Sequence, residues 1–266
     1  MKLVTYRAGG GPRVGVLLSD GVHDAGFDGN MVALIERWDE LRGRVQEEAE
    51  AGPPLADVEV LAPLRPRSLR DFLTFEGHLK NAMGNLGRPI AAEWYTTPAY
   101  YKWLPDTVIG PEDEIPWPGY TQKLDHELEL AIVIGRPGKD IPRERALEHV
   151  FGYTIWNDMS ARDTQAEELP IGMGPAKAKD WDGSNVLGPC IVTADEIDPA
   201  GLRMTVRVNG RDIEPVRAHE PGGAMSCRLY QTETGGRSGV PPEALLRAAV
   251  RSLPRAAERP GEETIP

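Results

Sequence analysis

The chain has 266 residues, of which 40% are hydrophobic, and a formal net charge of −11 at pH 7. This length and apolar fraction suffice for one large domain, or for a catalytic domain with a small appendage. The acidic balance excludes nucleic acid as the main partner, because phosphate binding needs a basic surface. No apolar run reaches the ~18 residues of a membrane span, and the first residues lack a signal-peptide pattern. We therefore expect a cytoplasmic protein that contacts no membrane.

The first 60 residues predict a small N-terminal α+β domain, residues 1–60. Short strands joined by Gly, Pro and Ser-Asp-Gly turns are expected at 2–6, 13–18 and 21–24. From Met31 to Glu48 the apolar residues recur at helical spacing, which predicts an amphipathic helix. His23 fits a half-exposed strand histidine better than a ligand. Nothing in this domain indicates chemistry.

The segment 68–84 predicts a helix, because Ser68 and Asp71 have the spacing of a helix start. On a continuous helix Asp71 and His78, two turns apart, would share one face. Taken alone, the pair fits a capping acid and a surface histidine better than a site. The Pro-rich residues that follow, 105–119, predict strands and turns.

A period-two pattern of aliphatic residues from Lys123 to Gly135 predicts a strand. Glu127 and Glu129 would then lie on the same face, about 6.6 Å apart along the chain. Two carboxylates this close repel each other unless a positive group lies between them. The Glu-x-Glu spacing alone fits a solvated strand face equally well.

A second apolar strand is expected over 151–156, and it delivers Asp158 to its carboxyl end. A helix should begin there, with Ser160 as its N-cap. Arg162 and Gln165, three residues apart, would share a face of that helix. Acids, an arginine and a glutamine thus converge on a strand end and a helix start. This convergence predicts a site for a divalent metal and an anionic substrate.

Residues 172–189 form a long, Gly-punctuated stretch, and long ordered loops in compact domains tend to carry function. Lys177 and Lys179, two apart, would point the same way if the loop is extended there. A later strand enters an Asn-Gly hairpin turn after Val208. No alternating strand is expected beyond it, and the Pro- and Gly-rich tail, residues 214–266, has a composition typical of partial disorder.

Four blocks of the sequence resemble the fumarylacetoacetate hydrolase family. They are Asp71-Phe-Leu-Thr-Phe-Glu-Gly-His78, the Glu127-Leu-Glu129 strand, Asn157-Asp-Met-Ser-Ala-Arg-Asp-Thr-Gln165, and Lys177-Ala-Lys-Asp with Leu187-Gly-Pro. The third block is the most specific. The resemblance covers about residues 2 to 213 and implies a β-rich α+β fold. Its catalytic domain, residues 61–213, would have mixed sheets rolled around the site, and the family usually forms homodimers.

The resemblance also implies roles for individual residues. The metal carboxylates would be Asp71, Glu127, Glu129 and Asp158. His78 matches the histidine that activates water, and Arg162 and Gln165 match substrate-binding residues. Lys179 matches the family's lysine, although the segment here reads Ala-Lys-Asp instead of Gly-Lys-Ser. An all-carboxylate set suits Mg²⁺ or Ca²⁺, with Mn²⁺ as a further option, and does not suit zinc.

The activity implied is hydrolytic cleavage of a C–C bond in a small β-diketo acid such as fumarylacetoacetate or an acylpyruvate, with His78 activating water. The same metal site would serve oxaloacetate decarboxylation, isomerisation, or hydration of a 2-hydroxy-dienoate. Asp71 with His78 favours hydrolysis. An inert metal-binding relative is a further alternative, because the family's Pro-Gly-Asp strand and Gly-rich closing turn are missing after Asn209.

Overall fold

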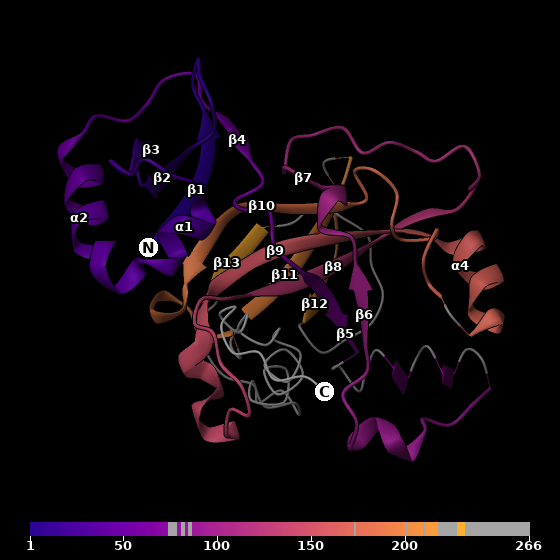
Figure 1. Ribbon diagram of the computed structural model, residues 1–266. Helices are drawn as coiled ribbons and strands as arrows, with labels where there is room; N and C mark the ends of the chain where they lie inside the picture. The colour runs from indigo at the N-terminus through magenta and orange to yellow at the C-terminus, as the bar shows by residue number, and fades with distance from the viewer. Residues whose placement is uncertain are drawn as a thin grey trace, which may run out of the picture.

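The computed structural model describes residues 1–73, 79–80, 83–84, 87–172, 174–199, 202–209, 211–217 and 228–231. Eight of the strands in these residues form one sheet (Figure 1). They are β1 (Lys2–Arg7), β2 (Arg13–Leu18), β3 (Gly21–Asp24), β4 (Glu59–Leu61), β7 (Val108–Ile109), β8 (Leu124–Ile134), β9 (Val150–Ala161) and β10 (Asn185–Thr193). The main path runs β3-β2-β1-β10-β9-β8, while β4 pairs with β1 and β7 with β10.

The sheet is mixed, because β7 runs parallel to β10 while the other pairings are antiparallel. The pairing of β1 with β10, at Lys2↔Val192 and Leu3↔Ile191, joins the first strands of the chain to the central ones. The α+β character expected from the sequence is thereby confirmed. The domain boundaries at residues 60 and 213 stay predictions.

Two smaller sheets complete the described strands. One consists of β5 (Leu69–Phe72) and β6 (Tyr100–Trp103), and the other, in the order β12-β11-β13, of β11 (Leu202–Val208), β12 (Arg211–Arg217) and β13 (Arg228–Gln231). Asn209 has the left-handed φ of 51° that the Asn-Gly turn predicts. The expectation of no strand beyond Val208 is wrong, since β12 and β13 both pair with β11. The remaining tail residues lie outside the described part of the chain.

The helix predicted to start at Ser68 is wrong within the described residues, because Leu69 to Phe72 form β5. Asp71 pairs with Tyr101 and Phe72 with Tyr100 of the aromatic-rich β6. Cross-strand contacts with aromatic side chains favour the strand over the helix. Asp71 is therefore held by a two-stranded sheet, not by a helix N-terminus.

Helices lie outside the sheets (Figure 1). They are α1 (Met31–Glu36), α2 (Trp38–Ala51), α4 (Arg162–Glu168) and the 3₁₀ turns η1 (Ala92–Tyr95), η2 (Pro105–Thr107), η3 (Arg143–His149), η4 (Leu169–Ile171) and η5 (Ala194–Glu196). The single helix predicted from Met31 is broken at Arg37, whose φ of −115° and ψ of 17° are not helical. No helix in the described ranges has the length and apolarity that crossing a membrane requires. His23 lies on strand β3 as predicted but is buried, not half-exposed, and it bonds to Asp20 and to the Gly52 carbonyl, as suits a structural histidine.

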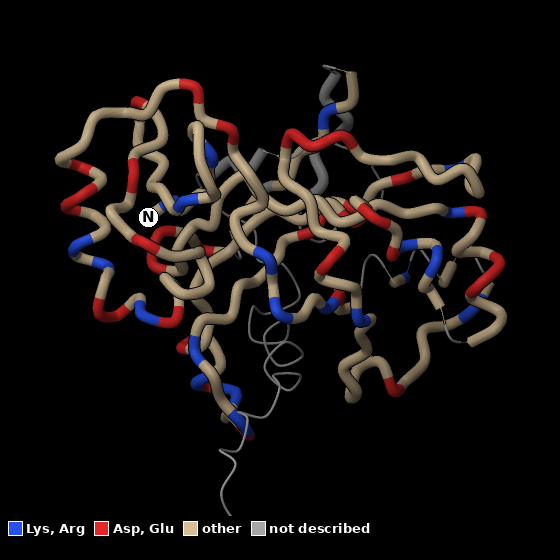
Figure 2. The backbone as a smooth tube through the Cα atoms, turned by 45° about the horizontal axis from the view of Figure 1, so that its top comes forward, with Lys and Arg blue, Asp and Glu red and all other residues tan. Residues whose placement is uncertain are grey.

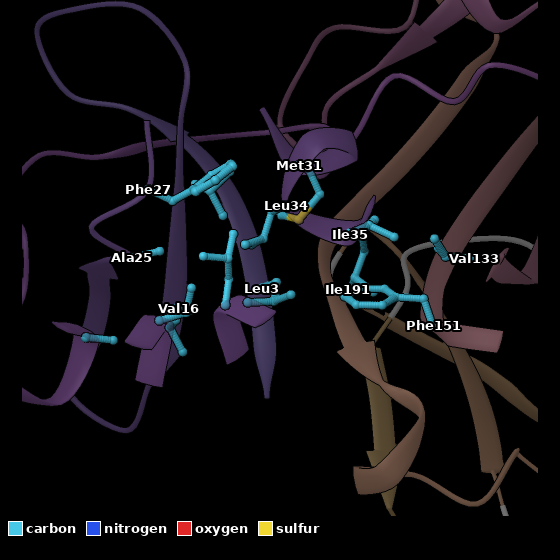
Figure 3. Packing of buried hydrophobic residues seen from close by; sticks show 14 residues of the cluster. Leu3, Val16, Ala25, Phe27, Met31, Leu34, Ile35, Val133, Phe151 and Ile191 are labelled. Carbon is cyan, nitrogen blue, oxygen red and sulfur yellow. The ribbon is translucent and has the colours of Figure 1, made fainter. Parts of the chain in front are cut away.

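A buried apolar cluster joins the helices to both halves of the sheet (Figure 3). Leu34 and Ile35 of α1 pack with Leu3 of β1, and with Val133 and Phe151 of β8 and β9. A second cluster, under the β5–β6 pair, contains Leu69, Trp103, Val108, Trp156 and Leu187. This second cluster fixes β5 over β9 and β10 and so places Asp71 near the central strands.

Replacement of Asn30 by Ala should destabilise the folded state by about 1 kcal/mol, the usual cost of losing an N-cap. The side chain of Asn30 accepts a hydrogen bond of 3.0 Å from the backbone N–H of Ala33, at the start of α1. Urea unfolding followed by circular dichroism measures the loss. Asn30→Asp keeps the cap and should stay near the parent's stability. Equal midpoints for the Ala variant and the parent would contradict the capping role.

Candidate metal and substrate site

Three acids from three strands meet at one point. Glu127 of β8 and Asp158 of β9 are directly opposite each other across the antiparallel pair, so their side chains share a face. Asp71 of β5 joins them, and one carboxylate oxygen from each of the three lies within 4.8 Å of the other two. Asp158 is fully buried. The clustering expected from the sequence is thus present for these three side chains.

Lys179 lies between two of these acids. Its side chain is 2% exposed, and its Nζ donates to Glu127 Oε2 and to Asp158 Oδ2, both at 2.7 Å. The backbone positions it, because Ala161 N–H at the end of β9 donates to the Ala178 carbonyl at 2.8 Å. Burial among carboxylates fixes the lysine as a cation at the centre of the site.

The loop around Lys179 is not extended, since residues 175–179 are bends and turns. The condition under which Lys177 and Lys179 would point the same way, an extended loop, is therefore not met. Lys177 Nζ instead lies 4.1 Å from the centre of the Tyr120 ring, whose hydroxyl donates to the Lys177 carbonyl. Of the two lysines, only Lys179 contacts the acids.

Arg162 begins α4 and binds two acids of β8. Its Nη1 donates to Glu127 Oε1 at 2.6 Å, and its Nε donates to Asp125 Oδ2 at 2.7 Å. The same Nη1 donates to Gln165 Oε1 at 3.0 Å, which confirms that Arg162 and Gln165 share a helix face. Sequence reasoning missed Asp125, although its place two residues before Glu127 puts both on one face of β8.

Ser160 does not cap this helix. It lies within β9, pairs with Asp125 across the sheet and is buried, and its hydroxyl donates to the Asp158 carbonyl. The helix starts at Arg162, with Ala161 at the N-cap position and no side-chain cap. The prediction of a Ser160 cap is wrong because β9 continues to Ala161, whose N–H donates to the Ala178 carbonyl, while the next N–H, of Arg162, donates to the Lys123 carbonyl.

Glu129 lies on the same strand face as Glu127, opposite Trp156. It is not one of the three acids that meet within 4.8 Å. Burial, followed by the charges of Asp71, Glu127 and Asp158, raises its pKa well above the ordinary value. Glu129 thus lies beside the three-acid cluster, and the negative charges of the cluster disfavour its ionisation. His78 lies outside the described residues.

The acids have strongly shifted pKa values. Burial, and then the charge of Glu127, raises the pKa of Asp71 to about 6. Burial raises the pKa of Asp158 to about 8, against the opposing effect of Lys179. Burial acts in the same direction on Glu127, but Lys179 and Arg162 outweigh it and lower the pKa of Glu127 to about 2. The site therefore holds more carboxyl groups than its two cations keep ionised.

The donor set fits a hard dication. All three converging groups are carboxylates, the ligands that Mg²⁺, Ca²⁺ and Mn²⁺ prefer. Oxygens on opposite sides of one Ca²⁺ lie about 5 Å apart, close to the 4.8 Å span of Asp71, Glu127 and Asp158. Asp158 Oδ1 is buried and has no hydrogen-bond partner among the described residues. A cation at this position would satisfy that oxygen.

Figure 2 colours the backbone by residue type and shows charged residues mostly along the outer turns of the tube, with longer uncharged stretches near its centre. Asp125, Glu127 and Glu129 on β8 are exceptions to that distribution. Charges on a half-buried strand cost desolvation energy, and they persist in structures when they are paired or bind a metal. On β8, Glu127 belongs to the three-acid cluster, Asp125 pairs with Arg162, and Glu129 borders the cluster.

The metal-free protein should lose stability as the pH rises from about 4 to about 8. The folded-state pKa values of Asp71 and Asp158 lie above the unfolded value of 3.8. The stability from their protonation is complete below 3.8, and is lost as the pH rises through about 6 for Asp71 and about 8 for Asp158. Thermal unfolding in EDTA across this range measures the trend. A Tm that rises steadily to pH 8 would contradict it.

These features define a three-carboxylate cluster that could hold a metal ion, with a buried lysine and an arginine at its edge, on a β-rich fold. The model of the fumarylacetoacetate (FAA) hydrolase C-terminal family matches residues 68–221, and the chain belongs to this family. The match includes the strands and turns that carry Asp71, Glu127, Asp158 and Lys179.

The matches to relatives with described activities cover most of this chain. The human mitochondrial oxaloacetate tautomerase FAHD2A is 30% identical over 229 residues, covering 80% of this chain and 70% of its own. The fumarylacetoacetate hydrolase of Exiguobacterium antarcticum has a TM-score of 0.66 and 33% identity, covering 81% of this chain and 75% of that one. The fold of the fumarylacetoacetate hydrolase family, which the sequence resemblance implied, is thereby confirmed.

A maleylpyruvate hydrolase from Sphingobium sp. SYK-6, solved with manganese(II) and pyruvate, has a TM-score of 0.63 and 25% identity, covering 81% of this chain and 76% of that one. Two uncharacterized proteins, from Pyrococcus abyssi and Pyrococcus horikoshii, are 37% and 35% identical over 124 residues. The matches cover 55% and 54% of those proteins, so the chain spans about half their length.

Proposed function

We propose that the protein is a metal-dependent hydrolase that cleaves a C–C bond in a β-diketo acid of the fumarylacetoacetate or acylpyruvate type. One observation carries the proposal: Asp71, Glu127 and Asp158 present oxygens to one point, with Lys179 between two of them. The related maleylpyruvate hydrolase, solved with manganese(II) and pyruvate, supports the pairing of a hard cation with a 2-keto acid.

Asp71, Glu127 and Asp158 would hold the cation, with Glu129 beside them as the fourth acid. When bound, the cation supplies Lewis-acid polarisation of the substrate's carbonyl and keto-acid oxygens. Mg²⁺, Ca²⁺ and Mn²⁺ all suit this donor set. The protein's own side chains supply positioning and charge.

Lys179 provides a fixed positive charge. Burial alone would lower its pKa, but the charges of Asp158 and Glu127 outweigh burial and raise it, so the ammonium group persists. We assign to it the stabilisation of negative charge that develops on the substrate as the C–C bond breaks. A preorganised cation at a buried site acts strongly because water does not screen it.

Arg162 and Gln165 would bind the substrate's carboxylate end. Arg162 is held by Asp125 and Glu127, and its Nη1 also donates to Gln165 Oε1. Because that oxygen accepts from Arg162, the amide NH₂ of Gln165 is the group left to donate to a carboxylate. Arg162 also fixes one oxygen of Glu127, and so acts as a positioning residue.

His78 would take a proton from the water molecule that attacks the acyl carbonyl. The bond between that carbonyl carbon and the pyruvate methylene carbon then breaks. The acyl group leaves as a carboxylic acid, and the methylene carbon takes up a proton to give pyruvate. The sequence resemblance supports this role for His78.

Keto–enol tautomerisation of oxaloacetate is the second candidate. The human oxaloacetate tautomerase matches 80% of this chain. The reaction needs the same cation site and a proton transfer, but no attacking water. Decarboxylation of oxaloacetate, and isomerisation or hydration of a 2-hydroxy-dienoate, would use the same keto-acid site.

A product assay tests the proposal. The purified protein with Mg²⁺ or Mn²⁺ is mixed with acetylpyruvate, maleylpyruvate and oxaloacetate, and products are followed by NMR. We expect acetylpyruvate or maleylpyruvate to give pyruvate and the matching carboxylic acid. Tautomerisation of oxaloacetate with no cleavage of either acylpyruvate would favour the second candidate. Complete inactivity with metal-dependent stabilisation would indicate an inert relative.

A further inference from the structure

A groove continues from the acid cluster along β8. Its volume is about 560 Å³, and it is lined by Asp71, by β8 from Glu129 to its end at Ile134, and by the following Gly135. This volume is within the ~300–1,000 Å³ of small-molecule pockets. From Glu129 to Val133 the strand covers about 14 Å. The groove is therefore long enough for a chain attached to a keto acid at the cluster.

The walls of the groove are mostly apolar. They include Val32, Ile35, Leu64, Leu69, Ala131 and Val133. Figure 3 shows Ile35 of α1 facing Val133 and Phe151. At Gly135 an added Cβ would lie 3.3 Å from Ile35 Cγ2, so α1 closes the groove at the end away from the acids.

Two arginines at the edge of the groove, Arg67 and Arg136, are paired with acids. Arg67 pairs with Glu36 at 2.7 Å, and Arg136 pairs with Asp39 at 2.7 Å. Both arginine side chains are exposed, at 75% and 59%, so water also solvates them. Neither pair offers a buried cation to a second carboxylate of a substrate.

Arg70 also lines the groove. Its Nη1 donates to Ser68 Oγ at 2.8 Å, and its guanidinium lies 5.9 Å from the centre of the Tyr100 ring on β6. Its Nε is buried without a partner among the described residues. Arg70 is the side chain that would bind a distal carboxylate, and the experiment below includes that outcome.

We propose that this groove holds the uncharged acyl chain of the substrate, so that long-chain acylpyruvates are preferred over short ones and over dicarboxylates of equal length. The inference rests on the proposed function, because the acid cluster must hold the keto-acid end. Continuity between the cluster and the groove, through Asp71 and Glu129, supports it. The apolar walls, and the pairing of Arg67 and Arg136 with acids, favour an uncharged occupant.

The test compares kcat/KM for acetylpyruvate, hexanoylpyruvate, octanoylpyruvate and suberylpyruvate, the last carrying a terminal carboxylate. Each buried methylene should raise kcat/KM by about three- to fourfold, and the rise from acetyl to octanoyl should reach at least about a hundredfold. Suberylpyruvate should fall well below octanoylpyruvate. A flat series, or a preference for suberylpyruvate that Arg70→Met removes, would overturn the proposal.

Two variants test whether the acyl chain of the substrate lies in the groove. Ala131→Leu fills it near Glu129, and Val32→Trp fills it near α1, so both should remove most of the octanoyl advantage while acetylpyruvate turnover persists. Retained acetylpyruvate turnover shows that each variant is folded. Arg44→Trp, which places the same new side chain at an exposed position of α2, is the control and should behave like the parent. Unchanged octanoyl preference in both groove variants would contradict the assignment.

Calorimetry separates this inference from the proposed function. Pyruvate and 2-oxodecanoate are titrated into the protein with Mn²⁺, and neither ligand needs to be cleaved. We expect 2-oxodecanoate to bind at least about tenfold tighter, with the gain lost in Val32→Trp. If no acylpyruvate is cleaved but this pattern holds, only the proposed function fails. If acylpyruvates are cleaved and the two ligands bind equally, only the groove inference fails.

Discussion

Replacing Asp158 with Asn should abolish binding of Mg²⁺ or Mn²⁺ and lower kcat/KM on the best acylpyruvate by at least about a thousandfold. The carboxylate is fully buried, and its Oδ2 accepts from Lys179 at 2.7 Å. Asn removes one of the three converging anionic donors and leaves Lys179 with Glu127 as its acidic partner. Loss of several kcal/mol of transition-state stabilisation corresponds to this change in rate.

The matched control is Asp140→Asn. Asp140 is exposed and has a left-handed φ of 52°, a conformation that Asn also adopts readily. This variant should bind Mn²⁺ and turn over substrate like the parent. Calorimetric titration with Mn²⁺ and steady-state assays at saturating metal measure both properties. Unimpaired metal binding by Asp158→Asn would remove this residue from the ligand set.

Replacing His78 with Ala should slow acylpyruvate hydrolysis by about a hundredfold to ten-thousandfold, the range that a general base contributes. Metal affinity should not change, because the proposed ligands are carboxylates. If the protein also tautomerises oxaloacetate, that reaction should be less affected, since it needs no attacking water. The contrast between the two reactions isolates the activation of water from binding.

His149→Ala is the control for this substitution. His149 ends η3, and its Nδ1 pairs with the Arg136 carbonyl at 3.0 Å, which is a structural contact. Its replacement should leave both reactions at the parent rate. Full acylpyruvate turnover by His78→Ala would show that another group activates the water.

Strand β8, and the face of it that Glu127 and Glu129 share, could be predicted from the sequence, because a period-two pattern of apolar residues indicates a half-buried strand. That Arg162 and Gln165 share a helix face could also be predicted from the sequence, since it depends only on local helix geometry. These features are set by short-range spacing. The pairing that places Asp158 opposite Glu127 joins two predicted strands, and its register follows from long-range packing.

Other features depend on tertiary contacts that local patterns do not encode. Ser68 and Asp71 have helix-start spacing, yet pairing with aromatic β6 makes their segment a strand. The sequence left the conformation of the loop around Lys179 open, and the turn anchored at Ala161 buries this lysine between two acids. The part that Asp125 plays in holding Arg162 is evident only from the hydrogen bond between the two side chains in the folded structure. In each case a residue distant in sequence determines the local structure.

The strands after Val208 were missed for a related reason. A strand can form where a neighbouring strand supplies hydrogen bonds, and β12 and β13 both pair with β11. Their sequences lack the alternation that would have predicted them. Backbone pairing depends on the neighbouring strands of the assembled sheet, so amino-acid composition predicts it only weakly.

A crystal structure with bound Mn²⁺, located by anomalous scattering, tests the central claim most directly. The account predicts one strong peak bounded by carboxylate oxygens of Asp71, Glu127 and Asp158, within about 2.3 Å of each ligand atom. A crystal at millimolar Mn²⁺ with no peak there, and with Lys179 still bridging Glu127 and Asp158, would contradict it.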